Sequence, residues 1–215
     1  MWATFDCYGT LIDWNGGIGR ELERLFGTGH AGTLLRAYHE LEPQVQREEP
    51  TRSYRDVLTV TLARLAEREG LDLAPDEQES LADSLPTWQP FPEARAALED
   101  AGMRGWQLAI LSNTDRDYIE ASLRLIGVEF ARVLVASELG SYKPARRHWQ
   151  AFREDVGDPG THVHVGASLF HDIAPAVELG LPTIWINRLG EDPEPQPDVE
   201  LRSLTGLGDA LDSLA

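Results

Sequence analysis

Cysteine and basic residues are scarce in this sequence of 215 residues. Cys7 is the single cysteine, which excludes an internal disulfide and a metal site built from several cysteines. Lys and Arg together number 19 against 36 Asp and Glu, so the formal net charge is −17. A surface of this charge repels nucleic acid and anionic membranes, and we expect neither as a partner.

Long apolar runs are also absent. No run approaches the roughly 20 apolar residues that a membrane-spanning helix needs. The first motif begins almost at Met1, which leaves no room for a signal peptide, and we therefore expect a cytoplasmic protein. The composition, with 42% hydrophobic and 26% charged residues, is ordinary for a globular protein.

Short apolar runs bounded by turn residues predict five buried strands, at residues 2–5, 106–111, 131–136, 162–166 and 182–187. Helical patterns separate the later runs, at 118–126, 146–155 and 173–179. Strands that alternate with helices favour a parallel sheet covered on both faces. We predict an α/β fold with a doubly wound, Rossmann-like sheet.

The stretch from residue 14 to residue 90 has a different character. It is helical in pattern, at 18–26, 31–47, 54–69 and 75–85, and three prolines in 86–94 end it. We interpret it as a helical cap inserted after the first strand. The predicted domains are a core of residues 1–13 and 91–215 and a cap of residues 14–90. The stretch 190–198, rich in proline and acid, is expected to be a surface loop.

Polar residues follow the predicted strands. Ligands of parallel α/β sheets bind at the carboxyl ends of the strands, so these residues are candidates for one site. Each has an ordinary explanation alone, such as a helix cap, but together they place carboxylates, hydroxyls, an amide and an ammonium on one rim. The candidates are Asp6, Thr10, Ser112, Asn113, Thr114, Lys143 and Asp172.

The motifs FDCYGT, LSNT, YKP and GASLFHD, in this order, resemble those of the haloacid dehalogenase-like hydrolase superfamily. More narrowly, FDCYGTLID, LAILSNT, SYKP and LPTIWINR look like the L-2-haloacid dehalogenase (type II) branch. The resemblance implies that Asp6 is a nucleophile that forms a covalent ester with the substrate. Lys143 would keep Asp6 ionised, because a nearby opposite charge lowers the pKa of a carboxylate.

Two positions separate this sequence from the phosphatases of the superfamily. Phosphatases carry an acid two residues after the nucleophile, which protonates the departing alkoxide, whereas this sequence has Tyr8. They also carry a magnesium-binding Asp where this sequence has Ala167. A halide leaves without a proton, and Asp6 and Asp172 alone are a thin oxygen set for magnesium. We expect chemistry without a metal or another cofactor.

The dehalogenase branch usually has Ser and Asn at the positions of Ala167 and Leu169, where they hold the hydrolytic water. With both residues replaced, the hydrolytic water would have to be positioned by Asp172, Ser168, His171 or Lys143. His171 is either the general base or a residue of the pocket wall. A Tyr commonly follows the motif lysine by six positions, and this place holds Trp149.

Substrate contacts are expected from both domains. Arg36 aligns with the cap arginine that contacts the substrate or halide, or else pairs with Glu40 one turn further on. Asn113 would donate to the halide and Ser112 to the substrate carboxylate. Thr10 would donate to Asp6 or the substrate, and Tyr8 would form a wall of the pocket. Cys7 is expected to be a buried, inert thiol.

The expected function is hydrolysis of short 2-haloalkanoic acids to 2-hydroxy acids through an aspartyl ester, by an enzyme similar to (S)-2-haloacid dehalogenases. The partner is then a small haloacid, and a homodimer is left open. One alternative is a magnesium-dependent phosphatase of the same superfamily. Another is a weakly active or non-catalytic homologue that keeps the scaffold.

Overall fold

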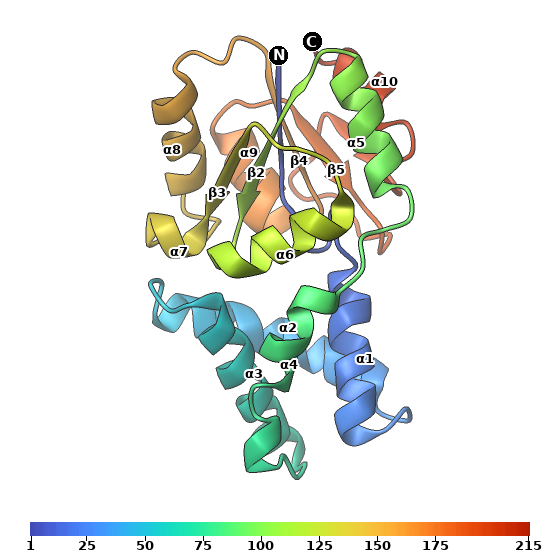
Figure 1. Ribbon diagram of the computed structural model, residues 1–215, viewed down its shortest axis with the longest axis vertical. Helices are drawn as coiled ribbons and strands as arrows, with labels where there is room; N and C mark the ends of the chain where they lie inside the picture. The colour runs from blue at the N-terminus through green and yellow to red at the C-terminus, as the bar shows by residue number, and fades with distance from the viewer.

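The computed structural model describes residues 1–215 and contains a six-stranded parallel sheet with helices on both faces (Figure 1). The strand order is β3-β2-β1-β4-β5-β6, which confirms the predicted α/β fold. The order reverses beside β1, where parallel sheets open a crevice for ligands. The strands are β1 (Trp2–Phe5), β2 (Gln107–Ser112), β3 (Arg132–Val135), β4 (His162–Gly166), β5 (Thr183–Ile186) and β6 (Val199–Leu201).

Helices cover both faces because side chains of the buried strands alternate between them. In β2, Ala109 and Leu111 join Trp149 and Phe152 of α8 in a small apolar cluster. Leu108 and Ile110, between them, join the larger core. The helices around the sheet are α5 (Ala94–Met103), α6 (Arg116–Ile126), α7 (Ala136–Leu139), α8 (Arg147–Val156), α9 (Ala174–Glu178) and α10 (Leu207–Asp212).

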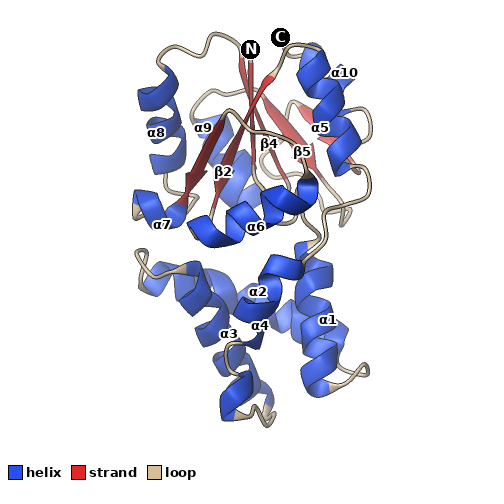
Figure 2. Ribbon diagram, viewed as in Figure 1, coloured by secondary structure: helices blue, strands red, loops and turns tan.

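A group of helices without strands lies beyond the carboxyl ends of the sheet, in the lower half of Figure 2. The side chains of Asp13 and Ser53 cap two of these helices by accepting from backbone N–H groups of the first turn. None of the helices has the length and apolar character needed to cross a membrane. The group consists of α1 (Trp14–Phe26), α2 (Ala31–Glu48), α3 (Tyr54–Glu69) and α4 (Ser80–Ser84). The boundaries between cap and core at residues 14 and 90 stay a prediction.

The secondary structure differs from the prediction in places where the pattern is short. The helix expected at 75–85 is divided into a 3-10 turn (Pro75–Glu77), α4 and a second turn (Leu85–Thr87), because a proline occupies the first or second position of each turn. β6 and the helices α5, α7 and α10 were not predicted. A π-helical turn (Leu169–Ile173) precedes α9, so the expected helix at 173–179 begins with an irregular segment.

Hydrogen bonds from the α/β part hold the start of α3. The carboxylate of Asp115 accepts from the backbone N–H groups of Tyr54 at 2.9 Å and Arg55 at 3.0 Å. The hydroxyl of Tyr142 donates to the carbonyl of Arg52 at 2.8 Å. A carboxylate at a helix N-terminus satisfies free N–H groups and complements the helix dipole. Asp115 therefore fixes where α3 lies relative to the sheet.

We predict that Asp115→Ala lowers the free energy of unfolding by about 1–2 kcal/mol, because it leaves two N–H groups of α3 without an acceptor. Asp115→Asn should lose less, since its amide oxygen replaces one acceptor. Urea unfolding measures both losses, and Glu120→Ala on the exposed side of α6 is the matched control. Equal stability of the Asp115→Ala and Glu120→Ala variants would contradict this role.

Candidate active site

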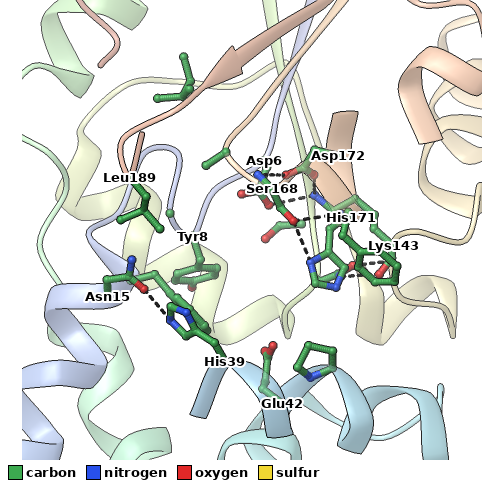
Figure 3. Close-up of a pocket in the computed structure, with 18 of the residues that line it drawn as sticks. Asp6, Tyr8, Asn15, His39, Glu42, Lys143, Ser168, His171, Asp172 and Leu189 are labelled. Atoms are coloured by element: carbon green, nitrogen blue, oxygen red, sulfur yellow. Dashed lines mark hydrogen bonds and ion pairs between the residues drawn. The ribbon is translucent and has the colours of Figure 1, made fainter. Parts of the chain in front are cut away.

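A cavity of about 550 Å³ lies between the carboxyl ends of the strands and the helices α1, α2 and α3 (Figure 3). This volume is in the range of small-molecule sites. The sheet side contributes Asp6, Ser112, Lys143 and Asp172, and the helices contribute Trp14, Asn15, His39, Glu42, Gln46 and Tyr54. The cavity therefore has a wall from each part of the chain.

Lys143 is the centre of the sheet side. Its Nζ donates to Oδ1 of Asp6 at 2.9 Å, to Oδ1 of Asp172 at 2.6 Å and to the carbonyl of Leu111 at 2.7 Å. The side chain is 1% exposed, and Lys143 is the only lysine of the sequence. An ammonium has three donors, and all three are engaged here. Although burial opposes it, the two carboxylates raise the pKa of Lys143 above its ordinary value.

The loop that carries Lys143 is fixed by Asn113. The backbone N–H of Lys143 donates to Oδ1 of Asn113 at 2.7 Å, and Nδ2 of Asn113 donates to the carbonyl of Lys143 at 2.9 Å. This reciprocal pair joins the end of β2 to the loop between α7 and α8. Asn113 was predicted to donate to a halide. Its amide bonds to the backbone of the lysine, which is a positioning contact, and Asn113 also lines the cavity, so the contact with a halide stays a prediction.

Asp6 follows β1 directly, and its backbone N–H donates to the carbonyl of Val165 at 3.0 Å. The turn after it passes through Gly9 at a φ of 93°, which favours glycine, and brings Thr10 back toward Asp6. Oγ1 of Thr10 donates to Oδ2 of Asp6 at 3.0 Å and accepts from the N–H of Ala167 at 2.9 Å. Burial raises the pKa of Asp6 to about 6, against the opposing charge of Lys143.

Asp172 lies in the π-helical turn, where its Oδ2 accepts from the N–H of Ser168 at 3.2 Å. Nε2 of His164 lies 3.6 Å from its Oδ1. Burial favours the neutral acid, but Lys143 and His164 together hold the pKa of Asp172 well below its usual range. The two carboxyls on Lys143 therefore differ, because Asp172 is the more firmly ionised one.

His171 lines the cavity beside this pair. Oγ of Ser168 accepts from the backbone N–H of His171 at 3.0 Å and lies 3.2 Å from its Nδ1. Burial lowers the pKa of His171 to about 4, so its imidazole is neutral at pH 7. A neutral ring whose orientation is fixed by Ser168 can accept a hydrogen bond from a ligand or water.

Tyr8 and Ser112 also line the cavity, as predicted. The hydroxyl of Tyr8 lies 2.9 Å from Oγ of Ser122, and burial raises its pKa well above the ordinary value. Tyr8 is thus a fixed, neutral wall. Oγ of Ser112 is buried and has no partner within the protein. Cys7 is buried and free.

The prediction for Arg36 is wrong in this structure. Arg36 is exposed on α2, does not line the cavity, and donates from Nη2 to Oγ1 of Thr33 at 3.3 Å. It does not pair with Glu40, which binds Arg68 at 2.8 Å.

The reason lies in the position of Arg36 along α2. The residues of α2 that line the cavity begin at His39 and end at Arg47, so the turn that carries Arg36 lies outside the cavity. Arg47, about three turns further along and on the same side of the helix, lines the cavity instead. Arg47 is exposed and forms no ion pair.

The family model for haloacid dehalogenase-like hydrolases matches residues 2–180, which is most of the chain. The chain belongs to the haloacid dehalogenase-like hydrolase family. It is 30% identical to an (S)-2-haloacid dehalogenase of Pseudomonas sp. (strain YL), over 98% of this chain and 94% of the relative. It is 31% identical to a phosphoserine phosphatase of Thermus thermophilus, over 61% of this chain and 56% of the relative.

The fold of this family member agrees with that of solved structures. The crystal structure of the L-2-haloacid dehalogenase RSc1362 superposes with a TM-score of 0.89 at 24% identity, and the match covers 98% of each chain. At this identity the likeness shows the fold, and the site has to be argued from its own residues.

Members of this family that are phosphatases use magnesium beside the nucleophile, and the residues present here do not fit that ion. Ala167 provides no side-chain ligand, and Asp6 and Asp172 both direct an oxygen to Nζ of Lys143. No group of three or more His, Cys, Asp or Glu side chains is arranged to hold a metal. Magnesium takes six oxygen ligands in octahedral order, and this donor set lacks them.

Several residues that line the cavity were not predicted from the sequence. His39 stacks on Trp14 with ring centroids 5.0 Å apart, and its Nε2 lies 2.9 Å from Oδ1 of Asn15. Arg188, the last residue of WINR, binds Glu93 at 2.8 Å. The helical residues belong to no motif, so only the amphipathic pattern of α1 and α2 could have pointed to them. The residues missed are Asn15, His39, Glu42, Gln46, Arg47, Tyr54 and Arg188.

We predict that Gly166→Ala destabilises the protein, because its Cβ would lie 2.4 Å from Cβ of Asp172. Displacing a buried carboxylate from its ammonium partner should lower the free energy of unfolding by about 2–3 kcal/mol. Thermal and urea unfolding measure the loss. Gly19→Ala in α1, where a Cβ meets nothing within 4 Å, is the control and should be neutral or slightly stabilising. Similar behaviour of the two variants would show that Gly166 is not needed for this contact.

Proposed function

We propose that this protein is a hydrolase that removes halide from short 2-haloalkanoic acids, with Asp6 as the nucleophile and without a metal. The observation that carries the proposal is the ammonium of Lys143 between the carboxylates of Asp6 and Asp172, beside Ala167, which offers no side-chain ligand to a divalent cation. The wall residue Tyr8 supports it, because it stands at the position where phosphatases of the family carry the acid that protonates a basic leaving group. The dehalogenase relative that matches nearly the whole chain supports it further.

The first step is attack of an Asp6 oxygen on the carbon that bears the halogen. A C–O bond forms, the carbon–halogen bond breaks, and the halide leaves with the bonding electron pair. Lys143 and Thr10 hold the carboxylate in one orientation, so its attack needs little reordering. Attack opposite to the halide inverts the configuration of the carbon.

The second step is hydrolysis of the ester. Water adds to the carbonyl carbon of Asp6, the bond from this carbon to the substrate oxygen breaks, and a proton is released as the 2-hydroxy acid departs. We assign the placement of the water to Asp172 and His171, since Asp172 is ionised and the ring of His171 is neutral at pH 7. The oxygen of the water then remains in Asp6.

The carboxylate of the substrate needs a cation, and Arg47 takes the place that was predicted for Arg36. Lys143 is engaged by Asp6 and Asp172, and Arg188 by Glu93. Arg47 is the arginine of the cavity wall without an ion pair. Ser112, whose hydroxyl lacks a partner, is the second contact proposed for this carboxylate.

Asp6→Ala should lower halide release from 2-chloropropionate by at least about a thousandfold, because no other carboxylate can form the ester. Asp6→Asn is run beside it, since deamidation of the new amide would restore some activity. In labelled water, the heavy oxygen should enter Asp6 in the first turnover and reach the product only later. Glu120→Gln, on the surface of α6, is the control.

Three results of this screen would contradict the proposal. Undiminished halide release by Asp6→Ala excludes Asp6 as the nucleophile. Release of phosphate from p-nitrophenyl phosphate that a chelator abolishes favours the magnesium-dependent phosphatase. Saturable binding of chloropropionate without halide release favours a non-catalytic homologue.

Halide release should also fall on the acid side with a midpoint near pH 6, because protonated Asp6 is not a nucleophile and burial raises its pKa to about 6. Lys143 opposes this rise, so Lys143→Met should move the midpoint to higher pH and lower the rate at every pH. The pH dependence of kcat/KM measures both. Arg95→Met, which removes an exposed ion pair with Glu99, should follow the wild type. An acid limb that stays in place in Lys143→Met would exclude this coupling.

A further inference from the structure

Leu189 is an apolar residue of the cavity wall that the proposed reaction does not use. It is 64% exposed and belongs to neither of the two apolar clusters of the fold. Figure 3 shows it on the side of the cavity where Asn15 lies, with His171 across from it. Phe170 is the other large apolar residue of the wall that is exposed, but its ring packs edge-on against His171, with centroids 4.9 Å apart. A single exposed leucine is ordinary on a protein surface, but a ligand of the cavity would bury this one and gain from its apolar area.

The loop that carries Leu189 is closed by Asn187, which is buried at the end of β5. Oδ1 of Asn187 accepts from the backbone N–H groups of Gly190 and Glu191, each at 2.9 Å. Its Nδ2 donates to the carbonyl of Glu191 at 2.9 Å and to Oε1 of Glu200 at 2.8 Å. Both donors and both lone pairs of this amide are therefore engaged, and Leu189 lies within the turn that they hold.

The residue before Leu189 joins the same loop to the nucleophile. Nη2 of Arg188 donates to the carbonyl of Thr10 at 3.0 Å, and Oγ1 of Thr10 donates to Oδ2 of Asp6 at 3.0 Å. Nη1 of Arg188 donates to Oε1 of Glu93 at 2.8 Å, which fixes the guanidinium. The fold therefore sets the backbone position of Leu189 relative to Asp6. A contact that is in place before the ligand arrives costs little ordering on binding.

Apolar side chains line the cavity between Asp6 and Leu189. Asp6 follows β1, Ala167 follows β4 and Ile186 ends β5, and these three strands are neighbours in the sheet. Ala167 and Ile186 both line the cavity, and the carbonyl of Ala167 is fixed by Nε1 of Trp185 at 2.9 Å. Neighbouring strands lie about 4.8 Å apart, so β5 lies about 10 Å from β1. This part of the cavity leads from the nucleophile past two apolar side chains to Leu189.

The proposed carboxylate contact lies in the opposite direction. Ser112 ends β2, which neighbours β1 on the side away from β4. A substrate whose carboxylate contacts Ser112 therefore directs the substituent of its reacting carbon toward β4 and β5. Glu191 also lines the cavity near Leu189 and would repel a second negative charge there, so an uncharged substituent is favoured.

The size of the cavity agrees with a substituent larger than a methyl group. Cavities of about 550 Å³ bury drug-sized ligands, and 2-chloropropionate is far smaller than these. Three bonds of an extended chain span about 3.5 Å, so a chain of about eight carbons spans the roughly 10 Å from β1 to β5. An alkyl substituent somewhat shorter than this meets the side chain of Leu189.

We propose that Leu189 is a specificity-determining residue, which favours 2-haloacids with a linear, uncharged alkyl substituent of about six carbons by contacting the end of that chain. This inference rests on the proposed function and extends its substrates from short acids to medium-chain acids. The contact is the same before and during displacement of the halide. It therefore lowers KM and leaves kcat nearly constant.

The first test is halide release along the series 2-chloropropionate, 2-chlorobutyrate, 2-chlorohexanoate and 2-chlorooctanoate. The wild-type kcat/KM should rise about threefold per methylene group, through KM, because each added group is buried. Leu189→Ala should lower the preference for 2-chlorooctanoate over 2-chloropropionate about tenfold, and Leu189→Met, which conserves the volume, should retain it. Leu125→Ala, which removes an exposed leucine of α6, is the matched control and should keep the wild-type preference.

The second test measures binding without turnover. Propionate and octanoate carry no halogen, and calorimetry gives their dissociation constants. Octanoate should bind the wild type about a hundredfold more tightly than propionate, and this ratio should fall about tenfold in Leu189→Ala. Unfolding curves of the variants should coincide with that of the wild type, because Leu189 packs in neither apolar cluster.

Three results would overturn the role of Leu189. One is a wild-type kcat/KM that stays flat or falls along the series. Another is an equal chain-length preference in Leu189→Ala and Leu125→Ala. The third is a dimer in light scattering that Leu189→Ala dissociates, which would assign this leucine to a contact with a second copy of the chain.

The proposed function fails in a different way. If no haloacid releases halide but octanoate still binds more tightly than propionate, and less so in Leu189→Ala, the alkyl site stands and the reaction is wrong. If halide is released without any effect of chain length, the reaction stands and the role of Leu189 is wrong.

Discussion

The ammonium of Lys143 between Asp6 and Asp172 is the interaction on which the site depends. Burying three charges is expensive, and the cost is offset only when every donor and acceptor finds a partner. Lys143 meets this condition with two carboxylates and the carbonyl of Leu111. The surrounding structure serves the same end, because Asn113 fixes the lysine loop and Thr10 holds the second oxygen of Asp6. The sheet topology makes this meeting possible, since the strand order reverses beside β1.

The same interaction restricts the chemistry. A single ammonium balances one of the two carboxylates, so the sheet side keeps a net charge of about −1. A dianionic phosphate would meet repulsion there, and magnesium would have to compete with Lys143 for the oxygens of Asp6 and Asp172. A monoanionic haloacid meets less repulsion there, and its halide leaves without a proton donor. Asp172 stays ionised and binds the same ammonium. Its charge therefore offsets part of the effect of Lys143 on Asp6, whose pKa is about 6.

The sheet side of the site could be predicted from the sequence, and the helical side could not. Asp6, Lys143 and Asp172 follow predicted strands, and in a parallel sheet all carboxyl ends meet at one edge. Arg36 and Arg47 lie about three turns apart on one side of α2, so the sequence pattern could not tell which of them reaches the cavity. The way α2 lies across the carboxyl ends of the strands decides this, and it depends on tertiary contacts. β6 was not predicted for another reason, because three residues are too few to show the alternation of a strand.

The two walls of the cavity handle buried acids in opposite ways. Asp172 stays ionised because a cation lies 2.6 Å away, whereas Glu42 has donors but no cation and therefore keeps a proton near neutral pH. The negative charge of the cavity is therefore concentrated on the sheet side, where the nucleophile lies, and the helical wall adds little to it near neutral pH. An anionic substrate then meets repulsion from one wall and not from both.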